Sequence, residues 1–350
     1  MPMNAIRFLE ETYDRFKKRL PNRLLHSKIA LESPVFISGL MRTGSYLLYD
    51  LLALSSDFTT PVRRTRRNKG LYGHGNWGKD NYQLTRSIKQ IPVEGAFLWF
   101  KSGVHRSRED IDSKPYKPAD LSRIADLVRL EYRGIRQGFT RGGVKFRILD
   151  KAPAFLSFIS IIDHVFPDAR YIFTIRDPRA VANSYLRRVR PPRFPQDIRN
   201  LKKYGTWGVP PRGWEGVRNK PLVYRICWQI SEEFKALEDA FNEFGSERVR
   251  IVRYEGLVAD PREITRSLLH FTQAKKYVNI KLIPERFQNF NPPWFDSSGN
   301  LAGEFGKDRM FKEEERDQFE PLRKWIDKLG YHESEISVVT HNIETRLQAV

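Results

Sequence analysis

The sequence predicts an α/β protein in which a mostly parallel sheet is covered by helices on both faces. Three observations indicate this fold. Short apolar runs alternate with segments of helical period along most of the chain. Hydrophobic residues make up 40% of the 350 residues, which is enough for a sizeable core. No internal repeat or low-complexity linker divides the pattern. We therefore expect a single domain over residues 1–350.

The expected elements follow in order along the chain. Strands are expected where apolar residues form runs of strand length, at 34–40, 146–150, 170–176 and 248–254. Helices are expected where the apolar period is helical, at 45–54, 118–139, 155–166, 180–189, 224–245 and 260–273. Asp120 is expected to cap the helix of the segment 118–139, and Asp177 the helix that follows it. Proline suits the first turn of the helices near 178 and 261.

Three segments extend this alternating core. In residues 1–33, Ile6, Leu9, Tyr13, Phe16 and Leu20 form one apolar stripe of a helix. We expect that helix to dock on its own domain, and a partner protein or a membrane surface is the alternative. Residues 190–221 are rich in Pro, Gly, Arg and Trp and predict a lid-like insertion. Residues 276–350 are expected to contain a loop and further helices.

Charge and cysteine content narrow the class of protein. The formal net charge is +19, which favours anionic partners such as nucleotides, anionic glycans, nucleic acid or an acidic membrane surface. The densest basic run, Arg63–Lys69, is either a solvated loop or a rim that attracts an anionic ligand. The single cysteine, Cys227, is expected to be buried as a small apolar residue, and the protein is expected in a reducing compartment. Without a long apolar run or a secretion signal, we expect a cytoplasmic protein.

The first candidate site follows the strand at 34–40. Gly39 and Gly44 have the G-x-x-x-x-G spacing of a phosphate-binding loop, but Ser45 stands where nucleotide-hydrolysing loops have lysine. Backbone N–H groups and a helix N-terminus can still hold an anion, and Arg42 supplies a positive charge. The alternative is a tight strand–helix turn with a solvated arginine.

A second candidate site follows the strand at 170–176. Arg176 ends this strand, Ser184 lies eight residues later, and Arg188 lies four residues beyond Ser184 on the same helix face. Two arginines and a hydroxyl can hold a phosphate, and ligands of open α/β sheets bind at strand carboxyl ends. We therefore expect two anionic groups of one ligand at neighbouring strand ends. The alternative is a surface Arg–Asp pair with a helix cap.

Four segments together resemble the sulfotransferases that use 3′-phosphoadenosine 5′-phosphosulfate. "GLMRTGSYLL" is similar to their 5′-phosphosulfate loop, and "YIFTIRDPRAVANSYL" to their 3′-phosphate strand and helix. "ILDKAPAF" and "RVRIVRYEGLVADPREITRSLLHF" resemble two further segments in the family's order, so the likeness covers roughly residues 34–275. It is closest to the broad branch of bacterial, carbohydrate and tyrosylprotein sulfotransferases. It implies a three-layer fold like that of the P-loop NTPases, the phosphosulfate donor and no metal.

The resemblance also implies roles for single residues. Arg42 and Lys151 would stabilise charge on the departing phosphate, and Thr43, Gly44 and Ser45 would hold the 5′-phosphate. Arg176, Ser184 and Arg188 would contact the 3′-phosphate, and Lys307 would contact the donor from a closing segment of the C-terminal region. Tyr254 would contact the adenine, and the alternative is a tyrosine of the core. Tyr46 departs from the family's small hydroxyl residue, keeping its backbone N–H but adding a ring beside the donor.

The proton acceptor and the acceptor substrate stay open at this stage. Glu94 is the first choice as general base, with His74 and His105 as rivals. Trp207 and Trp214 suit stacking on sugars or aromatic alcohols, but glycan, lipid, small alcohol and peptide tyrosine are all compatible.

Three rival functions remain. One is a nucleotide-binding module of the same fold that has lost its chemistry. A nucleotide kinase is disfavoured by the serine in the lysine position. A nucleic-acid-binding protein is suggested by charge alone, and no nucleic-acid partner is expected because no reading motif is present.

Overall fold

The computed structural model describes residues 30–61, 94–105, 116–135, 145–190, 195–207, 210–275, 280–287 and 312–331. The helix expected at 6–20 and the basic run at 63–69 lie outside these residues. In the part that is described, no helix is long and apolar enough to cross a bilayer.

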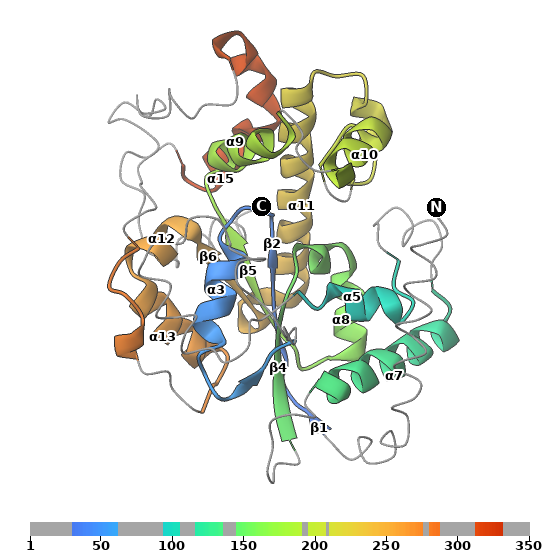
Figure 1. Ribbon diagram of the computed structural model, residues 1–350, viewed down its shortest axis with the longest axis vertical. Helices are drawn as coiled ribbons and strands as arrows, with labels where there is room; N and C mark the ends of the chain where they lie inside the picture. Colours follow the sequence, from blue (N-terminus) through green and yellow to red (C-terminus); the bar gives the residue numbers. More distant parts are fainter. Residues whose placement is uncertain are drawn as a thin grey trace.

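A parallel sheet forms the centre of the molecule (Figure 1). Its order is β1-β4-β2-β5-β6, β3 pairs with β4, and every pair is parallel. The register sets Ile37 opposite both Lys151 and Ile172, so β2, β4 and β5 end at the same edge. The strands are β1 (Ala30–Leu31), β2 (Val35–Gly39), β3 (Phe58–Thr59), β4 (Lys145–Lys151), β5 (Arg170–Ile175) and β6 (Val249–Arg253).

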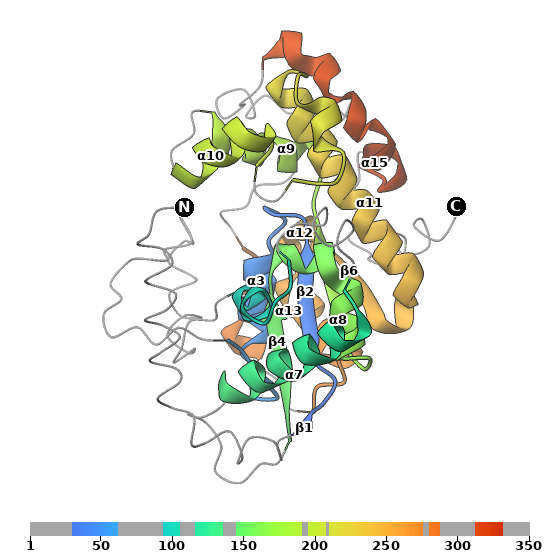
Figure 2. The same ribbon diagram turned by 90° about the vertical axis from the view of Figure 1, so that its right-hand side faces the viewer.

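Helices cover both faces of the sheet, as the alternating pattern predicts (Figures 1 and 2). One face carries α3 (Ser45–Leu52), α12 (Tyr254–Ala259) and α13 (Pro261–Phe271). The other carries α5 (Ala96–Lys101), α7 (Pro118–Ile135), α8 (Ile159–Val165) and α11 (Leu222–Arg248). Above the carboxyl ends of the strands lie α9 (Pro178–Val189), α10 (Pro195–Tyr204) and α15 (Arg323–Lys328).

The four predicted strands are confirmed, and the helices differ in detail. Asp120 lies within the first turn of α7 and is not its cap, because α7 begins at Pro118. In the first turn, its negative charge still interacts favourably with the positive end of the helix dipole. The segment at 155–166 begins as a 3-10 helix, η2 (Pro153–Phe158), before α8. The insertion at 190–221 contains α10 and the short η3 (Trp214–Val217). The remaining short helices are η4 (Ile280–Leu282) and η5 (Glu313–Leu322).

Two apolar cores hold these layers together. On the α7 side, the Phe36 ring meets Trp99 and Phe155 edge-to-face, with centroids 6.0 and 5.4 Å apart. Such aromatic pairs add stability beyond their buried area. On the other side, α3 and α13 bury leucines against β2. Cys227 is fully buried within the first core, as expected of a small apolar residue.

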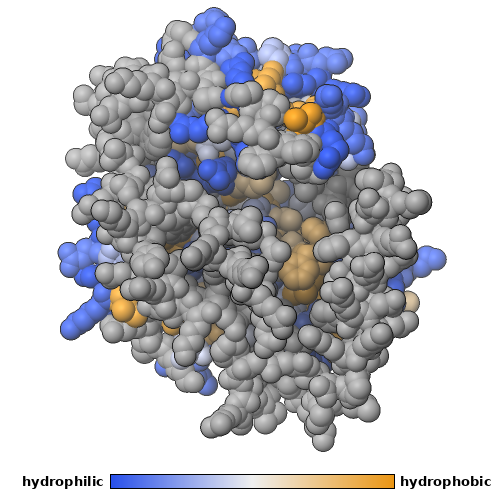
Figure 3. Space-filling model, in the orientation of Figure 1, coloured by the Kyte–Doolittle hydropathy of each residue, from blue (hydrophilic) through white to orange (hydrophobic). Residues whose placement is uncertain are grey.

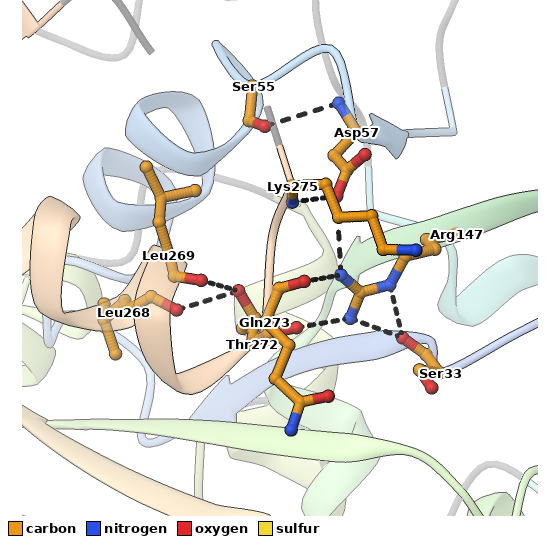
Figure 4. A network of polar contacts seen from close by, with 9 residues as sticks. All are labelled: Ser33, Ser55, Asp57, Arg147, Leu268, Leu269, Thr272, Gln273 and Lys275. Carbon is orange, nitrogen blue, oxygen red and sulfur yellow. Dashed lines mark hydrogen bonds and ion pairs between the residues drawn. The ribbon is translucent and has the colours of Figure 1, made fainter. Parts of the chain in front are cut away.

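The amino ends of the strands are tied together by Arg147 of β4 (Figure 4). Its guanidinium donates to the Ser33 carbonyl at 3.0 Å and to the Thr272 carbonyl at 2.6 Å. Asp57 Oδ2 lies 3.6 Å from Arg147 Nη1 and accepts the Lys275 N–H at 2.7 Å. These contacts join β4 to the chain that enters β2, to the end of α13 and to the turn before β3, at the edge of the sheet opposite the candidate site.

Candidate functional site

The loop between β2 and α3 curls through three residues with left-handed backbone. Gly39, Arg42 and Gly44 have φ of 115°, 69° and 82°. At Gly39 a Cβ would lie 2.5 Å from the Thr174 carbonyl oxygen, and at Gly44 it would lie 2.5 Å from the Tyr254 ring. Both glycines are therefore required by conformation and by close contact. Gly44 is the N-cap of α3 and provides no side-chain cap, which suits a helix N-terminus that receives an anion.

The loop after β5 meets this first loop through side chains. Asp177 caps α9 by accepting the Arg179 N–H at 2.8 Å, as predicted. Ser184 of α9 then accepts a hydrogen bond from Arg42 Nε at 3.0 Å, and Arg176 Nη1 donates to the Arg42 carbonyl at 3.4 Å. The structure thus brings together residues that the sequence assigns to two separate anion sites.

Positive charge concentrates where these loops meet. Partial burial lowers the pKa of Arg42, and the charges of Arg176 and Arg188 lower it further. Guanidinium groups that repel one another in this way are stabilised when an anion lies between them.

Tyr254 forms a wall of the same site at the end of β6. It is largely buried, and its ring lies 4.4 Å from the Arg176 guanidinium carbon and directly against Gly44. The next residue, Glu255, accepts the Asp177 N–H at 3.0 Å and the Tyr331 hydroxyl at 3.1 Å. The residues that follow β6 therefore contact both candidate anion-binding loops.

Lys151 ends β4 with a side chain that is fully buried. Its Nζ lies 2.6 Å from Glu94 Oε1 and 3.0 Å from the centroid of the Tyr46 ring. Burial lowers the pKa of Lys151 to about 8, while the Glu94 carboxylate opposes that shift. The ring of Tyr46 thus covers the lysine.

Two further acids near Lys151 were missed by sequence reasoning. Burial raises the pKa of Asp50, one helical turn after Tyr46, to about 7, and the charge of Lys151 opposes the shift. Burial also raises the pKa of Asp150 to about 7, while hydrogen bonds to the carboxylate, first of all the one from Tyr132, lower it. Neither acid stands in a motif, so only the folded arrangement identifies them.

Other predicted residues lie differently. The Thr43 hydroxyl points into the protein, 2.6 Å from both the Leu40 carbonyl oxygen and Thr174 Oγ1. His105 lies beyond the far end of α5 from Glu94, with its ring stacked on Tyr116. The rival base His74 and the predicted phosphate contact Lys307 are outside the described residues.

The two tryptophans of the insertion contact aromatic rings of the same chain. Trp207 packs edge-to-face on Tyr185 at 4.7 Å, and Trp214 on Tyr204 at 5.2 Å. Within the described ranges, no group of three His, Cys, Asp or Glu side chains is arranged to hold a metal ion.

Comparisons with known proteins find similar sequences and a similar solved structure. Two curated relatives, omega-hydroxy-beta-dihydromenaquinone-9 sulfotransferase Stf3 from Mycobacterium bovis and from Mycobacterium tuberculosis, are 23% identical over 279 residues. The match covers 72% of this chain and 66% of those proteins, so the chain spans just under two thirds of their length. The crystal structure of sulfotransferase STF9 from Mycobacterium avium is 15% identical and superposes with a TM-score of 0.53 over 90% of this chain and 80% of that one.

The likeness to STF9 indicates the same P-loop NTPase-like fold with a mostly parallel sheet. The profile of the sulfotransferase family matches residues 34–276. This chain therefore belongs to the sulfotransferase family.

Proposed function

We propose that the protein transfers a sulfuryl group from 3′-phosphoadenosine 5′-phosphosulfate to a hydroxyl acceptor. The observation that carries this proposal is the convergence of Arg42, Arg176 and Ser184 at the carboxyl ends of β2 and β5. One donor molecule that presents anionic groups to both loops accounts for that convergence. A nucleotide with a single phosphate chain accounts for the β2 loop alone.

The two ends of the donor bind different elements in this proposal. The phosphosulfate lies on the backbone N–H groups at Gly44 and Ser45, at the N-terminus of α3. Thr43 contributes its backbone, since its hydroxyl is engaged with Leu40 and Thr174. The 3′-phosphate accepts hydrogen bonds from Ser184 and from the guanidinium groups of Arg176 and Arg188. The Tyr254 ring packs against the Arg176 guanidinium.

The reaction requires little covalent chemistry from the protein. The acceptor oxygen forms a bond to sulfur while the bond from sulfur to the bridging phosphate oxygen breaks in line. The acceptor proton passes to Glu94, and the negative charge that grows on the departing phosphate is stabilised by Arg42 and Lys151. With a pKa of about 8, Lys151 is mostly cationic at neutral pH. The ring of Tyr46 holds this cation in place by a cation–π contact.

The acceptor class rests on a separate observation. Phe97, three residues after Glu94, is a large apolar side chain that is 53% exposed. Figure 3 shows apolar side chains in the middle of this face of the molecule, below hydrophilic side chains over the upper helices. The Stf3 relatives are named for an omega-hydroxylated dihydromenaquinone. We therefore propose a hydroxyl group carried on an apolar body.

The test is a transfer assay with donor labelled at sulfur. Long-chain primary alcohols, sugars and a tyrosine peptide serve as acceptors, and Arg42→Met is compared with Arg147→Met, which lies at the opposite edge of the sheet. We expect label in the apolar alcohol with the wild type and Arg147→Met, and a loss of about 100-fold or more with Arg42→Met. Donor binding without transfer to any acceptor would leave a nucleotide-binding module and contradict the proposed reaction.

A further inference from the structure

Asp150 is a fully buried carboxylate that the proposed chemistry does not use. It precedes Lys151 on β4 and has no exposed surface. Its Oδ1 accepts two backbone hydrogen bonds, from Lys151 N at 2.6 Å and from Gly95 N at 2.8 Å. Its Oδ2 accepts the Tyr132 hydroxyl at 2.5 Å, and that hydroxyl oxygen accepts Trp99 Nε1 at 2.8 Å. Both carboxylate oxygens are thus engaged by donors, which is how a buried carboxylate avoids a large desolvation cost.

The two donors on Oδ1 belong to the two segments that carry the charged pair of the site. One is the backbone of Lys151 itself, and the other is Gly95, directly after Glu94. Glu94 and Lys151 are 57 residues apart in the chain, yet their side chains meet at 2.6 Å. A single oxygen atom therefore joins the segment before α5 to an inner strand of the sheet. The contact thus lies directly beside both members of the Glu94–Lys151 ion pair along the chain.

The packing at Gly95 supports this reading independently. A Cβ on Gly95 would lie 1.8 Å from Asp150 Oδ2, closer than any real contact. The backbone of Gly95 has φ of −91°, which does not require glycine. The glycine is therefore required by its contact with Asp150 and not by its backbone conformation.

We propose that Asp150 is a positioning residue that holds Glu94 against Lys151 through the Gly95 and Lys151 backbone N–H groups. The catalytic meaning of this role rests on the proposed sulfuryl transfer. The Tyr132 hydroxyl, which accepts the Trp99 N–H, satisfies the other oxygen of Asp150.

Three variants separate positioning from stability. Gly95→Ala displaces the segment of Glu94 while Asp150 stays in place. Tyr132→Phe removes the contact on Oδ2 but leaves both contacts on Oδ1. Asp150→Asn keeps an oxygen that can accept both backbone N–H groups. We expect Gly95→Ala to lower kcat by about 100-fold, as displacement by about 1 Å does. Tyr132→Phe and Asp150→Asn should retain kcat within a few-fold, although both lose stability.

A second readout does not depend on activity. In the folded wild type, Lys151 Nζ is buried and ion-paired, so an amine-acylating reagent followed by mass spectrometry should find it protected. Gly95→Ala should raise its labelling rate, and Tyr132→Phe should not. If Gly95→Ala fails to fold, Asp150→Ala, which removes both acceptors, is tested in its place against Asp150→Asn.

The outcomes distinguish the two proposals. The role of Asp150 would be overturned if Gly95→Ala kept both the wild-type kcat and the wild-type protection of Lys151 from acylation. It would also be overturned if Gly95→Ala and Tyr132→Phe lost kcat and protection to the same extent. If the wild type transfers no sulfuryl group but the labelling pattern holds, the positioning role stands and the proposed reaction fails.

Discussion

Substituting Gly44 by alanine should destabilise the protein by two separable effects. The backbone of Gly44 has φ of 82°, where an L-residue costs about 1–2 kcal/mol. The new Cβ would also lie 2.5 Å from Tyr254 Cδ2, and Tyr254 is only 7% exposed, so its ring has little room to move. Overpacking of this kind costs about 1–3 kcal/mol. The expected loss in the free energy of unfolding is therefore about 2–5 kcal/mol.

Gly213 offers a matched control for the backbone effect. Its φ is 81°, and a Cβ there would meet nothing within 4 Å. Gly213→Ala should therefore lose only about 1–2 kcal/mol. Urea denaturation of both variants measures the difference, and Gly44→Ala in a Tyr254→Ala background should recover the part that comes from the ring. If Gly44→Ala costs no more than Gly213→Ala, the close contact between the loop and Tyr254 is refuted.

Three further predictions concern other parts of the molecule. Ser184→Ala should weaken binding of 3′-phosphoadenosine 5′-phosphate by about 1–2 kcal/mol and leave ADP binding unchanged, because the hydroxyl is proposed to contact the 3′-phosphate; calorimetric Kd values for both nucleotides check this. Arg147→Met should lower the free energy of unfolding by about 2–3 kcal/mol, because contacts with the Ser33 and Thr272 carbonyls are lost, while kcat stays the same. A lower kcat under conditions in which the variant is fully folded would contradict this prediction. For Lys151, the pKa falls from 10.5 to about 8 on folding, so the unfolded chain binds more protons between these values. The stability of the wild type relative to Lys151→Met should accordingly rise with pH from about 8 to 10.5, and a flat difference would show that the lysine is not desolvated.

The sheet and its main helices could be predicted because their signal is local. The strands at 34–40 and 170–176 are buried on both faces, so they appear as continuous apolar runs. Asp177 and Pro178 mark the start of α9 by the chemistry of a helix N-terminus. The two-residue strands β1 and β3 could not be predicted in this way, because so short a strand is defined by its partner, β4.

In the candidate site too, positions set by local structure could be predicted and positions set by the tertiary arrangement could not. Arg176 and Ser184 could be assigned because one strand, one turn and one helix set their spacing. The position of Tyr46 over Lys151 depends instead on the sideways arrangement of α3 and β4, which no local pattern encodes. In the sequence Asp150 is an ordinary strand residue. Its role depends on hydrogen bonds from Gly95 and Tyr132, which lie 55 and 18 residues away along the chain.

We propose above that the loops after β2 and β5 bind one nucleotide through two separate anionic groups. The most direct measurement is calorimetric titration of the wild type and of Arg176→Met with 3′-phosphoadenosine 5′-phosphate and with ADP. Charge-assisted hydrogen bonds to the 3′-phosphate should make the wild type prefer the first nucleotide by about 3 kcal/mol, or more than about 100-fold in Kd, and Arg176→Met should lose most of that preference. Equal affinity of the wild type for the two nucleotides would contradict the claim.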